Sequence, residues 1–355
     1  MRDRRTFLKG VGVVGTIGVL AGCSGESDEG GTDGTDGSAG GATATSTVES
    51  AENTASGTDE TDESNTGENA DNSNSEPYVD GTITFLMSPS EPQDQLRAQY
   101  TPIKERLNSY VDAVDTVEMQ YANNYSATLT ALGSGTGDIA ETGPFAAALG
   151  VNAGNAEVLL QRKGYGSWTY SSAIVTRPET EIESLGDIEG QTIAFADPLS
   201  ASGSLYPLGM LQEAGLSVPE EPGSPAGADF TPRWSTHAQA LEALQAGTVD
   251  AAGVGYFIVA NDDRSGFIDG VEPVEQAEGI PRAPILVSPQ LTDEEASTVQ
   301  SAFVEAGGEL YLGADGEADT EDDLWFSDVR PADASTYQPV VDKATALGYG
   351  AEVFE

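Results

Sequence analysis

The sequence predicts an α/β fold in which short strands alternate with helices, for three reasons. From residue 78 onward, runs of β-branched and aromatic residues alternate with segments of helical periodicity, which favours mostly parallel sheets. Residues 24–76 are mostly small and polar, and they do not bury enough surface to fold. The remaining length, residues 78–355, is large for one core, so two lobes are expected.

The first half of this folded part predicts five strands and three helices. Residues 81–87 are rich in β-branched and aromatic side chains and form the first expected strand. Apolar residues recur with helical spacing from Leu96 to Leu107, which predicts one helix over residues 96–110. The other expected elements are strands at 114–120, 138–140, 158–161 and 170–177 and helices at 127–132 and 145–149.

The second half repeats the same alternation. A short helix and loop are expected at 182–188, followed by a strand at 192–195 and a helix at 205–214. The helix predicted at 292–306 begins with three acidic residues, which the positive end of a helix dipole favours. The remaining expected elements are strands at 229–234, 249–253 and 285–288 and a helix at 237–246.

Residues 1–23 have the pattern of an export signal. Arg4 and Arg5 precede a short apolar stretch, as in twin-arginine signals. The stretch ends in Leu20-Ala21-Gly22-Cys23, which resembles a lipobox, where cleavage leaves Cys23 for lipid attachment. We therefore expect a protein anchored by lipid to the outer face of the cell membrane.

Residues 24–77 are expected to be a disordered acidic tether rich in Ser, Thr and Gly. The whole chain has a formal net charge of −44, which is typical of proteins from halophiles and repels nucleic acids and anionic membranes. In molar salt the Debye length is about 3 Å, so an anion site must work through short, directed hydrogen bonds.

Cysteine and histidine each occur once, which limits the chemistry that this chain can perform. A single cysteine excludes an internal disulfide and a thiolate metal site, and one histidine argues against His-rich metal centres. We expect no metal, no cofactor and no catalytic residue.

The sharpest local motif is Asp197-Pro-Leu-Ser-Ala-Ser-Gly203, between a predicted strand and a predicted helix. Small residues let backbone N–H groups approach a ligand, and a helix N-terminus offers unpaired donors to an oxyanion. An ordinary serine cap is the alternative interpretation. Two similar corners, residues 123–126 and 138–145, precede the motif, and ligands of open α/β folds bind at such strand ends.

The order of the motifs resembles the phosphate/phosphite/phosphonate-binding subunits of ABC importers over residues 81–284. The resemblance rests on Tyr125 before an Ala-Leu-rich helix, the 197–207 motif and the later His237 helix. The other matching motifs are Gly137-Asp-Ile-Ala, Gly143-Pro144, Tyr170-x-Ser172, Ser184-Leu-x-Asp187 and Gly247-x-Val-Asp250.

The resemblance implies a type 2 periplasmic-binding-protein-like fold, with two lobes, two hinge strands and a ligand cleft between them. Lobe 1 would comprise residues 78–172 and 285–355, and lobe 2 residues 173–284, with crossovers near 172–175 and 284–287. The implied ligand-binding residues are Tyr125, Tyr170, Ser200, Ala201, Ser202, Gly203 and His237. His237 would either bind the anion or orient a serine, and packing and capping are the alternatives for the tyrosines and for His237.

Two departures from the family bear on the ligand. Ala201 replaces a usual threonine, which removes one hydroxyl donor. Ala283 stands where members that bind aminoalkyl phosphonates have a carboxylate, so a ligand ammonium would lack its partner. We expect the neighbouring Arg282 to be exposed at the surface, with contact to the anion as the alternative. The acidic residues 313–323 lack the spacing of a calcium loop, and we expect them to form a solvated loop.

The sequence therefore favours a monomeric, lipid-anchored solute-binding protein, not an enzyme, that binds phosphate, phosphite or a small alkylphosphonate by lobe closure. Its expected partners are an ABC permease and its ATPase, and not nucleic acid. Two alternatives remain: a surface sensor for another oxyanion, and a hydrolase with Ser200 or Ser202 as nucleophile. No residue is placed by sequence to activate either serine, which argues against the hydrolase.

Overall fold

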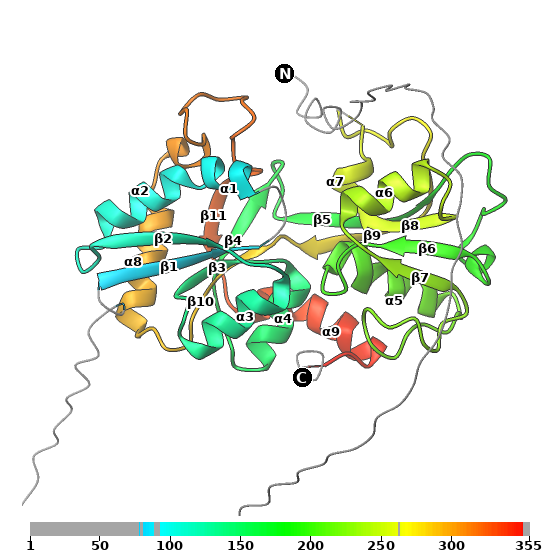
Figure 1. The fold of residues 1–355 in the computed structure, drawn as a ribbon, viewed down its shortest axis with the longest axis horizontal. Coiled ribbons are helices and arrows are strands. Elements are labelled where there is room, and N and C mark those ends of the chain that lie inside the picture. Colours follow the sequence, from blue (N-terminus) through cyan, green and yellow to red (C-terminus); the bar gives the residue numbers. More distant parts are fainter. Residues whose placement is uncertain (1–77, 79–80, 89–92, 262, 351–355) are drawn as a thin grey trace, which may run out of the picture. The chain divides into compact units, whose positions relative to one another are not determined.

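The structure, a computed structural model, describes residue 78 and residues 81–88, 93–261 and 263–350 (Figure 1). Its helices and strands form an α/β arrangement with two sheets, which confirms the predicted fold class. The predicted leader, Cys23 and the predicted tether lie outside the described residues. In the part that is described, no helix has the length and apolarity needed to cross a bilayer.

The first sheet, as far as the chain is described, has the strand order β11-β4-β10-β3-β1-β2. β1 pairs in parallel with β2 and β3, whereas β10 pairs antiparallel with β3 and β4, and β11 antiparallel with β4. The strands are β1 (Thr82–Met87), β2 (Thr116–Tyr121), β3 (Ile139–Glu141), β4 (Glu157–Gly164), β10 (Pro284–Val287) and β11 (Phe326–Pro331). The helices are α1 (Gln93–Gln99), α2 (Thr101–Tyr110), α3 (Tyr125–Ser134), α4 (Pro144–Asn152) and α8 (Asp293–Val304).

The second sheet has the order β7-β6-β8-β5-β9. β6 pairs in parallel with β7 and β8, and β5 pairs antiparallel with β8 and β9. The strands are β5 (Thr169–Thr176), β6 (Thr192–Phe195), β7 (Thr231–Trp234), β8 (Ala251–Gly255) and β9 (Glu272–Pro281). The helices are α5 (Tyr206–Glu213), α6 (His237–Gln245) and α7 (Tyr256–Val259).

The expectation of mostly parallel sheets is wrong, because both sheets are mixed. The chain leaves the first sheet after Gly164, enters the second at Thr169, and returns between Pro281 and Pro284. Parallel neighbours arise through long crossovers that usually contain a helix. β5 and β10 are instead reached through connections of a few residues, and each pairs antiparallel with the strands beside it.

Most predicted elements are present, and the differences have local causes. The helix expected over 96–110 is divided into α1 and α2, because Pro102 lacks the N–H that a continuous helix needs and lies in the first turn of α2. β9, β11, the short helix α7 and the C-terminal helix α9 (Gln338–Leu347) were not predicted.

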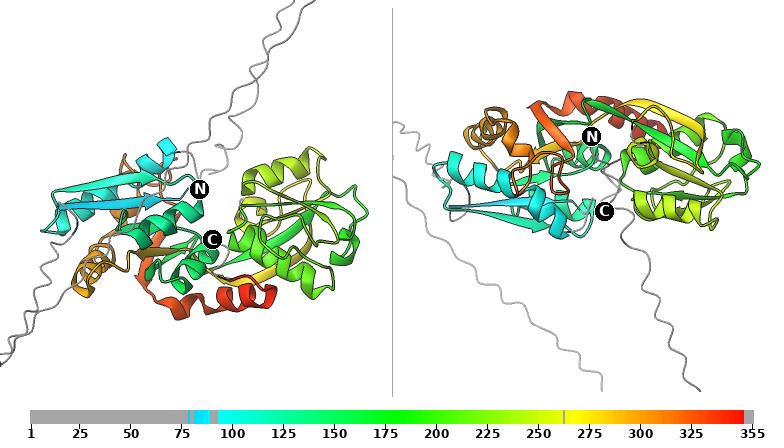
Figure 2. Two further views of the ribbon diagram at one scale, coloured as in Figure 1. Left: turned by 60° about the horizontal axis from the view of Figure 1, so that its bottom comes forward. Right: turned by 90° about the horizontal axis from the view of Figure 1, so that it is seen from above.

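Helix α9 contacts elements that belong to the first sheet and elements that belong to the second. It packs against α4, α5 and β9, and Figure 2 shows it beside β9 in both views. Lys343 of α9 forms an ion pair of 2.6 Å with Glu213 at the end of α5. Just before α9, the Tyr337 hydroxyl donates a 2.7 Å hydrogen bond to the carbonyl oxygen of Arg282.

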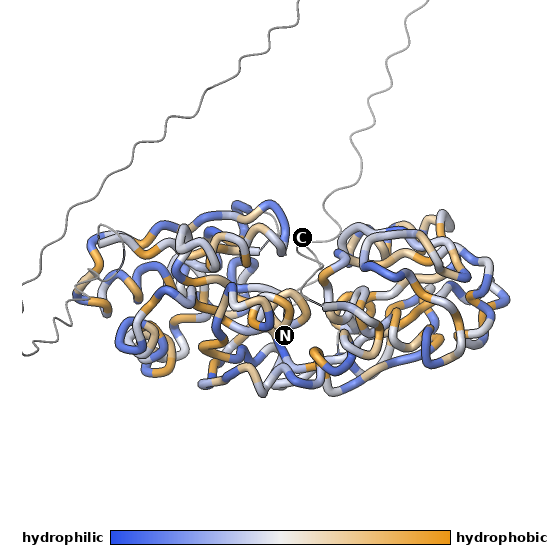
Figure 3. Tube along the Cα trace, turned by 90° about the horizontal axis from the view of Figure 1, so that it is seen from below, coloured by the Kyte–Doolittle hydropathy of each residue, from blue (hydrophilic) through white to orange (hydrophobic). Residues whose placement is uncertain are grey.

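The buried apolar residues of the described part form three clusters. Figure 3 shows how hydrophobic and hydrophilic residues alternate along the chain. One cluster includes Phe85 and Phe303 of the first sheet and its helices, and another includes Val254 and Leu244 of the second. The largest joins residues from α4, α5 and α9, such as Phe145, Leu208 and Val340. Each such side chain stabilises the fold by about 2 kcal/mol.

Candidate functional site

The motif at residues 197–207 forms a capped turn that leads into α5. Residues Ala201–Leu205 are already helical, in a π-helical turn, so the predicted loop is shorter than expected. Ser200 caps this turn, since its Oγ accepts a 3.1 Å hydrogen bond from the Gly203 N–H. Asp197 stabilises the residues just before this turn, because its Oδ1 accepts a 2.8 Å hydrogen bond from the Leu199 N–H.

His237 lies at the start of α6 and joins this turn to β8. Its Nε2 lies 3.1 Å from the Ser200 Oγ, and its Nδ1 accepts a 3.1 Å hydrogen bond from the Gly255 N–H. The helix begins at His237 because the Thr236 side chain caps it and Gln239 completes the capping box.

These contacts determine the protonation state of His237. Burial lowers the pKa of His237 to about 4, so the ring is neutral near pH 7. A backbone N–H occupies Nδ1, and the ring proton therefore resides on Nε2 and is donated to Ser200. Ser200 Oγ thus accepts two hydrogen bonds, and its own hydrogen is left to donate to a third group.

The same geometry argues against a nucleophilic serine. A general base needs a free lone pair next to the serine hydroxyl. In this arrangement Nε2 carries the proton and faces Ser200, while the Nδ1 lone pair is occupied. Ser200 is therefore a hydrogen-bond donor and not an activated nucleophile.

Gly203 allows His237 to approach the turn this closely. A Cβ atom at Gly203 would lie 2.2 Å from the Ala196 Cβ and 2.6 Å from the His237 Cε1. Both distances are shorter than side chains tolerate, and the Ala196 Cβ has no freedom to move away.

Tyr170 of β5 joins the same cluster. Burial raises the pKa of Tyr170, and hydrogen bonds from the side chain and backbone of Ser202 oppose that rise. The Ser202 carbonyl oxygen accepts a 2.7 Å hydrogen bond from the Ser172 hydroxyl of the same strand. The Phe257 ring of α7 lies 6.2 Å from Tyr170 and 5.1 Å from His237, between centroids.

Tyr125 and Thr142 belong to the first sheet and its helices. Tyr125 begins α3, where Asn124 caps the helix with a 2.7 Å hydrogen bond from the Ala127 N–H. Burial raises the pKa of Tyr125, as do the nearby charges of Glu141 and Asp197. The Thr142 hydroxyl is buried and has no hydrogen-bond partner within the described residues.

A buried ion pair stabilises the backbone around Thr142. Arg162 donates a 2.8 Å hydrogen bond from Nη1 to Glu141 Oε2, and both side chains are almost fully buried. Arg162 also donates from Nη2 to the Thr142 carbonyl oxygen at 3.3 Å, which fixes the backbone at that corner.

The predicted ligand residues are partly brought together by these contacts. Ser200, Gly203 and His237 touch one another, and Ser202 reaches Tyr170. Tyr125 lies close enough to Tyr170 and Asp197 for their charges to raise its pKa, whereas Ala201 contributes only a buried backbone. Sequence reasoning missed Thr142 and Phe257, although Thr142 stands in a corner that the sequence had singled out.

Arg282 is not where the sequence placed it. Its exposure is 7%, so the expectation of a surface arginine is wrong. Burial lowers the pKa of its guanidinium to about 10. The side chain is covered because it packs on Gly164 and near Trp325, which come from distant parts of the chain.

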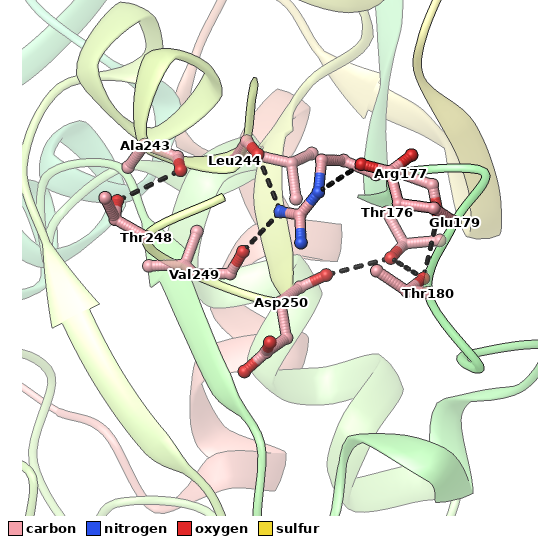
Figure 4. A network of polar contacts seen from close by, with 9 residues as sticks. All are labelled: Thr176, Arg177, Glu179, Thr180, Ala243, Leu244, Thr248, Val249 and Asp250. Carbon is pink, nitrogen blue, oxygen red and sulfur yellow. Dashed lines mark hydrogen bonds and ion pairs between the residues drawn. The ribbon is translucent and has the colours of Figure 1, made fainter. Parts of the chain in front are cut away.

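Two other sequence motifs have structural roles. Arg177 donates hydrogen bonds to the carbonyl oxygens of Leu244, at the end of α6, and of Val249, shortly before β8, and Thr176 donates to that of Asp250 (Figure 4). The motif Gly247-x-Val-Asp250 therefore holds the connection between α6 and β8 against the end of β5. In the acidic loop, Asp322 and Asp323 accept hydrogen bonds from backbone N–H groups of the loop itself.

Comparison with known proteins identifies a family that matches most of the chain. The model of the phosphonate periplasmic substrate-binding proteins of ABC transporters matches residues 85–337. The phosphate-import protein PhnD of Mycolicibacterium smegmatis is 32% identical over 139 residues, which span 38% of this chain and 43% of that relative.

Solved structures share the fold at low identity. The binding-protein component of an ABC phosphonate transporter from Pseudomonas aeruginosa is 20% identical, with a TM-score of 0.59 over 75% of this chain and 86% of that one. PhnD1 from Prochlorococcus marinus, in complex with methylphosphonate, is 15% identical, with a TM-score of 0.57 over 76% of this chain and 98% of that one.

Proposed function

The chain belongs to the phosphonate periplasmic substrate-binding family of ABC transporters, and from this premise we propose that it binds a phosphorus oxyanion outside the cytoplasm and delivers it to an ABC permease and its ATPase. The ligand is phosphate, phosphite or a small phosphonate. Export through the twin-arginine signal, lipid attachment at Cys23 and a monomeric state in a salt-rich environment belong to the same proposal.

The observation that carries this proposal is the fixed donor at Ser200. His237 and the Gly203 N–H both donate to Ser200 Oγ, so the serine hydrogen is free for an acceptor. A phosphoryl group has several acceptor oxygens and no donor when it is fully ionised. Ser202, Tyr170 and the helix N-terminus at Ala201 add neutral donors, which bind an anion through directed hydrogen bonds at high salt.

Thr142 supplies a donor from the first sheet. A buried hydroxyl without a partner costs about 1–3 kcal/mol, and a ligand oxygen would remove that cost. Tyr125 would act from the same side. Donors on elements of both sheets would couple ligand binding to closure of the two lobes, the change that a permease recognises.

Calorimetric titration of the purified protein in molar KCl tests the proposal. Phosphate, phosphite, methylphosphonate and sulfate would be titrated separately. Micromolar or tighter binding of a phosphorus anion, with sulfate much weaker, is the expected result. Binding of sulfate alone, or of none of the four, would contradict the proposed ligand class.

A further inference from the structure

Arg282 is held rigidly at the junction between β9 and β10. Its backbone N–H donates a 3.0 Å hydrogen bond to the Trp168 carbonyl, and its own carbonyl accepts from Tyr337 at 2.7 Å. The side-chain Nε donates a 3.1 Å hydrogen bond to the Ser167 carbonyl oxygen. Backbone and side chain are therefore both positioned where the chain returns to the first sheet.

The guanidinium has no anionic partner in the described part of the chain. The ion pairs found there do not include Arg282, and the charged groups close enough to affect it are Arg264 and Arg162, which are also cations. A buried charge without a partner is costly, and this chain has 59 acidic residues from which a partner could have come.

Aromatic rings surround the guanidinium without using its outer N–H groups. The Arg282 Cζ lies 5.2 Å from the centroid of Tyr165, 5.3 Å from that of Tyr170 and 5.9 Å from that of Trp325. Rings stabilise a cation through their faces, but they accept no conventional hydrogen bonds from it. A guanidinium has five N–H donors in a fork that matches a carboxylate. Among the residues that the structure describes, acceptors are found for the Arg282 Nε and not for its outer N–H groups.

Tyr170 connects Arg282 to the proposed oxyanion site, because its ring lies beside the guanidinium and its hydroxyl interacts with Ser202. We propose that Arg282 binds a carboxylate on the substituent of the phosphorus oxyanion, so that the protein prefers small carboxylated phosphonates over alkyl or aminoalkyl phosphonates. This inference rests on the proposed function and narrows its ligand class.

The test compares methylphosphonate, phosphonoacetate and 2-aminoethylphosphonate by calorimetry in molar KCl. The unmodified protein should bind phosphonoacetate at least about ten-fold more tightly than methylphosphonate, because a charge-assisted pair is added. 2-Aminoethylphosphonate should bind most weakly. In Arg282→Gln the ratio between the first two ligands should fall close to one, whereas Arg233→Gln, at an exposed arginine of β7, should retain the full preference.

The outcomes separate this inference from the proposed function. Equal affinity for phosphonoacetate and methylphosphonate, or a preference that survives in Arg282→Gln, would overturn the role of Arg282 and leave oxyanion binding intact. Absence of binding by phosphate and by all phosphonates would overturn the proposed function itself. If Arg282→Gln does not fold, Arg282→Lys keeps the charge but not the fork, and it should lose most of the preference; full retention would overturn the inference.

Discussion

His237 binds no ion and performs no acid–base step in this account; it fixes the direction of a serine hydroxyl. Its two ring nitrogens bond to Gly255 and Ser200, which come from segments far apart in the sequence. A neutral imidazole with a defined proton is a reliable donor, whereas a titrating imidazole would change the site with pH.

Replacement of Ser200 tests the donor directly. Ser200→Ala removes a hydrogen bond to a charged ligand, which typically contributes about 1.5–3 kcal/mol, so the affinity for the bound oxyanion should fall about ten- to hundred-fold. Ser134→Ala, at an exposed serine of α3, is the matched control and should bind normally. An unchanged affinity in Ser200→Ala would show that the ligand lies elsewhere.

The lowered pKa of His237 also predicts a dependence of stability on pH. Between pH 6.5 and about 4 the unfolded chain binds a proton at His237 and the folded chain does not, so stability falls as the pH falls through this window. The loss in free energy of unfolding that is attributable to His237 has an upper bound of about 3 kcal/mol. The actual loss is smaller than this bound, because the ring is only partly buried.

Denaturant unfolding of the protein and of His237→Gln measures this effect. The stability difference between the two should shrink from pH 7 to pH 4.5 and stay constant between pH 7 and 8. A difference that does not vary with pH would contradict a His237 that stays neutral in the folded protein.

At the residue scale, the sequence pointed to polar residues that contact one another in the structure, but not to the surroundings of Arg282. Ser200 and Ser202 were singled out because donors next to a helix start suit an oxyanion, and Tyr170 and His237 because of the resemblance to a known family. The burial of Arg282 was not predictable, since it depends on Tyr165 and Trp325, which pack around it only in the folded chain.

The turn at the start of α5 is the element on which the site depends. Its conformation requires close contact between Gly203, Ala196 and His237. Gly203→Ala should therefore destabilise the protein by about 1–3 kcal/mol, as overpacked substitutions do, and weaken oxyanion binding.

Gly308→Ala is the matched control, because no atom lies within 4 Å of a Cβ at that position. Its free energy of unfolding should stay within about 0.5 kcal/mol of that of the unmodified protein. Chemical unfolding of both variants measures the difference, and equal stability of the two would show that the turn is looser than described.

Elements with a clear local pattern were predictable, and those defined by tertiary contacts were not. β1 and β6 are rich in β-branched and aromatic residues, and α8 has its acidic first turn. β9 has three glutamates and a glycine among its ten residues, and it is a strand because it pairs along β5. Propensity alone does not identify such a strand.

For the whole molecule, the net charge of −44 predicts a requirement for salt. Carboxylates at this density repel one another, and molar salt shortens the Debye length to about 3 Å. The thermal unfolding midpoint should therefore rise steadily from 0.1 M to 2 M KCl. A midpoint that is independent of KCl would contradict self-repulsion as the limit on stability.

We propose that the protein holds one phosphorus oxyanion between hydrogen-bond donors from elements of both sheets. The most direct measurement is a crystal structure of the protein grown with methylphosphonate in molar KCl. We expect phosphonate oxygens within hydrogen-bond distance of Ser200 Oγ and Thr142 Oγ1, with His237 still bonded to Ser200. A phosphonate bound away from both hydroxyls, or bound by His237 with Ser200 turned aside, would contradict it.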